Sequence, residues 1–117
     1  MNSPVLRGDV FMASLDPAEG SEQGGTRPVV VVSRDALNKF SPVVVIAPIT
    51  DAANKKKIYP SHVKVTAGVG GLTMDSLVIC EQVRAINKTR LKRQMGKLDR
   101  PTLISIEAAL KITLDLT

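Results

Sequence analysis

The sequence predicts a mainly β fold with helices: a small, strongly curved antiparallel sheet, best described as an SH3-like barrel, followed by a C-terminal α-helix. Short segments rich in valine and isoleucine occupy the first part and middle of the chain, and the convincing helical pattern comes last. About five short strands that end in a helix fit a barrel better than a sandwich. At 117 residues the chain has the size of one domain, so we assign residues 1–117 to a single domain.

The N-terminal half contains three segments with strand character. Residues 10–15 are apolar and rich in β-formers, residues 29–32 are four consecutive valines, and residues 43–50 form a third buried run. Between the last two, residues 34–40 suit one or two helical turns. Pro48 cannot donate a backbone hydrogen bond, so it indicates a bulge or an edge within the third strand.

The C-terminal half contains two more predicted strands and the main helix. Residues 63–66 alternate, residues 68–71 are a glycine-rich turn, and residues 77–86 are predicted as the last long strand. Asn87 suits the start of a short turn. The sequence Asp99-Arg100-Pro101 then opens a helix. Its apolar stripe is predicted from positions three or four apart: Leu103, Ile106, Leu110 and Leu114.

Charge and composition narrow the possible partners. Sixteen Lys and Arg against eleven Asp and Glu leave a net charge of +5, which favours a polyanion such as nucleic acid. Aromatic residues make up only 3% of the chain, whereas general single-strand binders stack bases on several rings, so cold-shock, RRM and SSB-like platforms are disfavoured.

Location and redox chemistry follow from a few segments. The longest apolar run, residues 43–49, is far too short to cross a bilayer, so we expect no membrane association. Residues 1–4 lack the cationic and apolar pattern of a signal peptide, which predicts a cytoplasmic protein. The single cysteine, Cys80, follows three apolar residues and is interpreted as a buried structural thiol.

The connection from Asp16 to Arg27 is the most informative segment. Hairpin loops usually take about 2–5 residues, so this longer link between two expected hairpin partners requires another explanation. Its glycines allow a close approach of the backbone to a ligand, and its polar residues can make contacts. A binding loop and a flexible solvent loop fit the composition equally well. A phosphate-binding P-loop is excluded because no Gly-Lys-Ser/Thr follows.

The remaining inventory limits the possible chemistry. His62 is the only histidine, so a two-histidine ribonuclease is impossible within one chain, and we interpret His62 as a satisfied surface or edge residue. The carboxylates show no metal-ligand spacing, so we expect neither metal nor cofactor. Residues 84–100 contain seven cations and one acid, which suits either a solvated face or a nucleic-acid contact.

Four segments of the chain resemble the MazF/PemK toxin family, and together they span nearly its whole length. The Gly-Ser-Glu-Gln-x-Gly-x-Arg-Pro stretch is long enough to be specific. The segments are Arg7-Gly8-Asp9-Val10, Gly20-Ser21-Glu22-Gln23-Gly24-Gly25-Thr26-Arg27-Pro28, Ala47-Pro48-Ile49-Thr50 and Cys80-Glu81-Gln82-Val83-Arg84-Ala85-Ile86.

The resemblance implies a fold, an activity and a set of site residues. Family members are cytoplasmic, dimeric endoribonucleases with an SH3-like barrel, which cut single-stranded RNA at short sequences without metal and are inhibited by a cognate antitoxin. Carried over by position, Arg27 and Thr50 match the catalytic arginine and threonine, and Ser21 matches a serine of the same pocket. Residues implied to contact RNA or organise the site are Glu22, Gln23, Glu81, Gln82 and Arg84.

The implied chemistry agrees with the residues present. The substrate's 2′-hydroxyl attacks the adjacent phosphorus, giving 2′,3′-cyclic phosphate and 5′-hydroxyl ends. Arg27 can then stabilise the added charge on the phosphoryl oxygens, but it is a poor base because a guanidinium keeps its proton. Thr50 and Ser21 can orient the phosphate. Glu22 or Glu81 would accept a proton if burial raised its pKa.

Two alternative functions stay open, and two partners are expected. A gyrase-targeting toxin on the same barrel would need no arginine-centred pocket, and a non-catalytic SH3-like nucleic-acid-binding module would need only the basic stretch. An antitoxin with an acidic, partly disordered segment would complement the positive field. A homodimer is expected from the resemblance.

Overall fold

A computed structural model describes residues 4–117, so Met1–Ser3, part of the segment used to predict location, lie outside the described residues. The elements follow the chain as β1 (Asp9–Ser14), β2 (Thr26–Val31), α1 (Asp35–Phe40), β3 (Val43–Asp51), η1 (Ala52–Asn54), β4 (His62–Val65), η2 (Val69–Gly71), β5 (Ser76–Ile79), η3 (Cys80–Gln82), β6 (Arg84–Asn87), η4 (Lys88–Arg90), β7 (Leu91–Lys97) and α2 (Arg100–Leu114), where η marks a short 3₁₀ turn.

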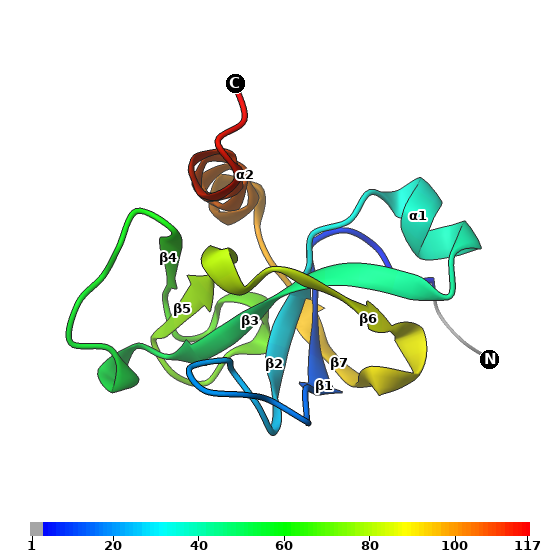
Figure 1. Cartoon of the computed structure of the whole chain (residues 1–117), viewed down its shortest axis with the longest axis horizontal. Coiled ribbons are helices and arrows are strands. Elements are labelled where there is room, and N and C mark those ends of the chain that lie inside the picture. The colour runs from blue at the N-terminus through cyan, green and yellow to red at the C-terminus, as the bar shows by residue number, and fades with distance from the viewer. Residues whose placement is uncertain (1–3) are drawn as a thin grey trace.

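The strands form one antiparallel sheet in the order β4-β5-β3-β2-β1-β7, with β6 also paired to β3. The sheet is strongly curved, and α2 covers β4 and η3 at one side of it (Figure 1). The predicted mainly β architecture with a C-terminal helix is therefore confirmed. Within residues 4–117, neither α-helix has the length and apolar character needed to span a bilayer.

The two faces of β2 and β3 bury two separate clusters of apolar side chains. Alternate strand residues point to opposite faces. Val30 and Ala47 accordingly join the cluster under α2, whereas Val31 and Ile46 join the cluster on the other face. These buried side chains explain why the valine runs form the centre of the sheet.

Helix α2 begins where the sequence predicted. The Asp99 carboxylate caps it by accepting a hydrogen bond from the Thr102 backbone N–H at 3.2 Å. Ile106 is buried and Leu103 and Leu110 are partly buried, but Leu114 is 52% exposed. Its assignment to the buried stripe was wrong because the last turn of α2 extends beyond the core.

The predicted long strand over residues 77–86 is interrupted. Strand β5 pairs Ile49 with Val78, and a continuous register would pair Ile46 with Glu81, yet Ile46 pairs with Arg84. The three residues of η3 take up this shift. The chain thus keeps following the edge of β3, but η3 bulges out of the sheet.

The basic stretch contains a strand that the sequence analysis missed. Strand β7 carries few β-forming residues, and it lies at the edge of the sheet, paired with β1 through an irregular register. Charged side chains suit such an edge because they discourage pairing with another chain. The long connection is also shorter than predicted, because Arg27 belongs to β2.

Candidate functional site

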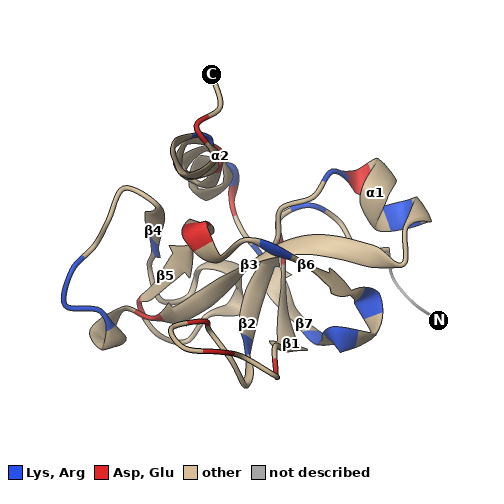
Figure 2. Cartoon of the chain, in the orientation of Figure 1, with Lys and Arg blue, Asp and Glu red and all other residues tan. Residues whose placement is uncertain are grey.

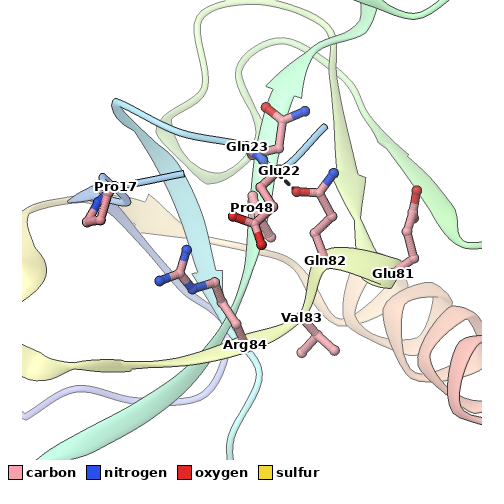
Figure 3. Close-up of a pocket in the computed structure, with 8 residues that line it drawn as sticks. All are labelled: Pro17, Glu22, Gln23, Pro48, Glu81, Gln82, Val83 and Arg84. Carbon is pink, nitrogen blue, oxygen red and sulfur yellow. Dashed lines mark hydrogen bonds between the residues drawn. The ribbon is translucent and has the colours of Figure 1, made fainter. Parts of the chain in front are cut away.

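A groove of about 450 Å³ lies between the β1–β2 loop, the middle of β3 and the η3–β6 segment. Figure 3 shows the polar side chains around it. It brings together five predicted site residues from two separate segments: Glu22 and Gln23 from the first, and Glu81, Gln82 and Arg84 from the second. The residues lining it are Pro17, Glu22, Gln23, Pro48, Glu81, Gln82, Val83 and Arg84.

The bulge at η3 supplies one wall of the groove. The apolar side chains of β5 and Ile86 hold the chain on the sheet on either side, while Glu81 and Gln82 stand in the extruded turn. Pro48 lies opposite, where β3 changes its partner from β6 to β5. Pro48, which has no N–H, therefore lies between the residues of β3 that pair with β6 and those that pair with β5. The predicted bulge is thus present at this position, but in the strand opposite Pro48, and β3 is not an edge strand.

Gln82 binds the β1–β2 loop through both ends of its amide. Its Oε1 accepts a hydrogen bond from the Gln23 backbone N–H at 2.6 Å, and its Nε2 donates to the Ser21 carbonyl at 3.1 Å. The first of these bonds is drawn in Figure 3. Ser21 thus meets the groove through its backbone. Gln82 holds the loop in the position where the loop closes the groove.

Arg27 is the second residue of β2, next to the end of the loop, and it is not among the residues that line the groove. Its Nε donates to the Gly24 carbonyl at 2.7 Å, and the side chain is half-buried. Within residues 4–117 no hydrogen bond or ion pair engages its two terminal nitrogens. The guanidinium is therefore oriented by one bond while its fork is free to bind a two-oxygen anion.

Thr50 lies on the same sheet face as Arg27 but is less accessible. Val29 pairs with Pro48, and Arg27 and Thr50 are each two residues farther along the same strands, so both point to the face of Pro48. Thr50 is 6% exposed, and its hydroxyl accepts a 3.4 Å hydrogen bond from Asn54. It lines a smaller hollow of about 100 Å³.

Two arginines hold the base of the loop. Arg90 donates to the carbonyls of Ser14 and Asp16 at 3.2 and 2.7 Å, and Arg84 donates to the carbonyl of Leu15 at 3.5 Å. Part of the basic stretch is thus structural. Nothing in the sequence distinguishes Arg90 from the other six cations of this stretch.

Glu81 faces away from the loop residues and binds the start of β4. Its carboxylate accepts hydrogen bonds from the Ser61 hydroxyl at 2.7 Å and from His62 Nε2 at 3.0 Å. Burial raises the pKa of Glu81, but these bonds outweigh it and hold the pKa below the usual value. The condition set for Glu81 as a proton acceptor, a pKa raised by burial, is therefore not met, and a carboxylate with a lowered pKa is a weak base.

Two further sequence interpretations concern single residues. His62 is satisfied and lies on the edge strand β4, as one of the two alternatives predicted, but its side chain is buried. Burial, reinforced by the nearby Glu81 charge, raises the pKa of the Cys80 thiol to about 11, which confirms an unreactive buried cysteine. Among residues 4–117, no group of three or more His, Cys, Asp or Glu is arranged to hold a metal ion.

Comparisons with known proteins identify the family. The profile of the "PemK-like, MazF-like toxin of type II toxin-antitoxin system" family matches residues 6–114. The chain belongs to this family. It is 46% identical over 112 residues to the Endoribonuclease MazF of Staphylococcus epidermidis, an alignment that covers 96% of this chain and 92% of that protein. The family assignment from the four sequence segments is therefore confirmed.

Solved structures of MazF-like toxins share the fold. A MazF of Deinococcus radiodurans superposes with a TM-score of 0.82 at 24% identity, covering 97% of this chain and 99% of that chain. The Mycobacterium tuberculosis toxin MazF-mt6 gives 0.78 at 27% identity, covering 93% and 98%. A mycobacterial endoribonuclease in complex with its cognate antitoxin gives 0.79 at 24% identity, covering 96% of each chain.

Proposed function

We propose that this chain, an endoribonuclease toxin of a type II toxin–antitoxin system, cleaves single-stranded RNA at short sequences without a metal ion. The main support is Arg27: its Nε is anchored to Gly24 of the loop whose Glu22 and Gln23 line the groove, and no hydrogen bond or ion pair within residues 4–117 engages its fork. Such a cation can stabilise the charge that develops on a phosphoryl oxygen during RNA cleavage.

The proposed reaction uses the substrate's own 2′-hydroxyl. Its oxygen forms a bond to the adjacent phosphorus, the bond from phosphorus to the 5′ oxygen breaks, and a proton leaves the first oxygen while another reaches the second. The products are a 2′,3′-cyclic phosphate and a 5′-hydroxyl. Arg27 binds the non-bridging phosphoryl oxygens, and the hydroxyls of Thr50 and Ser21 orient the phosphate.

The groove residues are proposed to bind the RNA around the reacting phosphate. Glu22 and Gln23 come from the loop, and Glu81, Gln82 and Arg84 from the opposite wall. Thr50 is buried and accepts a hydrogen bond from Asn54, which leaves its own O–H group to donate to the phosphate. Arg84 supplies a positive charge to this wall.

We also propose a homodimer and inhibition by an antitoxin whose acidic segment occupies the groove. Two observations on relatives support the inhibitor: structures of a mycobacterial endoribonuclease and of Deinococcus MazF each contain an antitoxin. Light scattering coupled to size exclusion measures the mass of the chain alone and tests the dimer directly.

The deciding experiment incubates the purified chain with a defined RNA in EDTA. Discrete cuts with cyclic phosphate ends are expected, and mapping them identifies the target sequence. An oligonucleotide with a single 2′-deoxyribose at the cleavage site should bind but stay intact. Cleavage of that oligonucleotide, or a strict need for added metal, would contradict the proposed reaction. RNA that is bound but not cut would indicate a non-catalytic binding module.

A further inference from the structure

The segment that begins β4 is linked to the β1–β2 loop through η3. Ser61 and His62 bind the Glu81 carboxylate, and Gln82, the next residue, binds the loop. Ser61 also accepts the Cys80 backbone N–H through its carbonyl at 3.0 Å. The turn is therefore held from β4 on one side and holds the loop on the other.

We propose that Ser61 and His62 are positioning residues of the ribonuclease site: they fix Glu81, so that the η3 turn presents Gln82 to the loop. This inference rests on the proposed function. The register shift between β5 and β6 leaves Glu81 and Gln82 of η3 outside the β3 ladder, and the backbone bond from Cys80 to Ser61 fixes only the first residue of the turn. The bonds to Glu81 orient the rest of the turn.

His62 suits this role because its surroundings select one tautomer. Its ring is 2% exposed. Nδ1 accepts a hydrogen bond from the Tyr59 backbone N–H at 3.2 Å, so in the neutral ring Nε2 carries the proton and donates to Glu81. The Tyr59 ring also packs edge-on against His62, with centroids 5.4 Å apart. The donor directed at Glu81 therefore has a fixed position.

The first test replaces Ser61 by alanine, a small change at a residue outside the groove lining. Losing one hydrogen bond to a carboxylate is expected to accelerate hydrogen exchange of the Gln23 amide by about threefold to tenfold. In RNA cleavage, KM should rise by a similar factor while kcat changes little, because a smaller fraction of molecules holds the loop closed. Ser105→Ala is the matched control: Ser105 is exposed on α2 and lines the same hollow as His62, but no hydrogen bond within residues 4–117 involves its hydroxyl.

The second test separates geometry from charge at Glu81, using hydrogen exchange of the free protein. Glu81→Gln keeps an oxygen for the His62 donor and a group for the Ser61 hydroxyl, so Gln23 exchange should stay within about twofold of wild type. Glu81→Ala removes both and should resemble Ser61→Ala or exceed it. His62→Gln, which can still donate through its amide, should also stay near wild type. Amides of the buried strand β2 report any global loss of stability.

The outcomes distinguish this inference from the proposed function. If the wild-type chain cuts RNA in EDTA but Ser61→Ala changes neither Gln23 exchange nor KM, the positioning role is wrong. It is equally wrong if Gln23 exchange accelerates while cleavage stays normal. If the wild-type chain cuts no RNA but the exchange pattern appears as expected, the ribonuclease proposal fails while the link from Ser61 to the loop stands.

Discussion

Replacing Arg27 by alanine is expected to slow RNA cleavage by about 100-fold to 1,000-fold. Removing one preorganised donor to a developing oxyanion typically costs about 2.7–4 kcal/mol of transition-state stabilisation. That range applies because the Gly24 carbonyl orients the guanidinium at 2.7 Å before any substrate arrives. Arg27→Lys should give an intermediate rate, since an ammonium keeps the charge but not the fork.

The same substitution should leave the fold intact. Arg27 is half-buried and its side chain makes one hydrogen bond, so its removal costs about 0.5–1.5 kcal/mol of stability. For a chain of this size that lowers the melting temperature by about 2–6 °C. Circular dichroism on heating measures this change. A much larger loss would mean that the side chain serves mainly to stabilise the loop.

Single-turnover cleavage of an end-labelled RNA in EDTA is the suitable assay, because it isolates the chemical step from product release. Arg34→Ala is the control, since Arg34 is an exposed cation before α1 whose side chain makes no hydrogen bond to the β1–β2 loop. The two variants have equal net charge. Comparable turnover by both would refute the role assigned to Arg27 and would move the search for charge stabilisation to Arg84.

Three further predictions concern stability. Gly71→Ala should cost more than about 3 kcal/mol in chemical denaturation, because the new Cβ would lie 2.1 Å from the Met95 carbonyl oxygen, whereas Gly68→Ala, with open space, should cost less. Asp99→Ala should cost about 1 kcal/mol through loss of the α2 cap. The folded-state pKa of Glu81 is lowered, so ionised Glu81 adds to the free energy of unfolding above the ordinary pKa of 4.5, and this stabilisation is lost as the pH falls through the folded-state pKa. Acidification should therefore lower the stability of the wild type more than that of Glu81→Gln.

Local patterns in the sequence were sufficient for the elements that bury apolar side chains. The three valines of β2 form the centre of the sheet, and Asp99 caps α2, because burial and capping act over a few neighbouring residues. Strand β7 lacked such a pattern. Its existence depends on backbone pairing with β1, a contact between distant segments that short-range composition does not encode.

The break at η3 was also invisible in the sequence, for a different reason. Residues on both sides of it have strand character, and nothing between them marks a turn. The interruption arises because β3 changes partners at Pro48, which is a property of the assembled sheet. The family resemblance did place Glu81 in the site. Its bonds to Ser61 and His62 join segments about 20 residues apart and could be seen only in the folded structure.

The charge pattern of the loop constrains how RNA can lie in the groove. The loop is acidic and is flanked by basic segments (Figure 2). Its carboxylates partly serve the loop itself, since Asp16 accepts the Gly25 N–H and Glu22 accepts the Glu19 N–H. A phosphate near these carboxylates would be repelled, whereas the amino group of a base can donate to them. We therefore expect the phosphates to follow the arginine side of the groove and the base edges to face the loop.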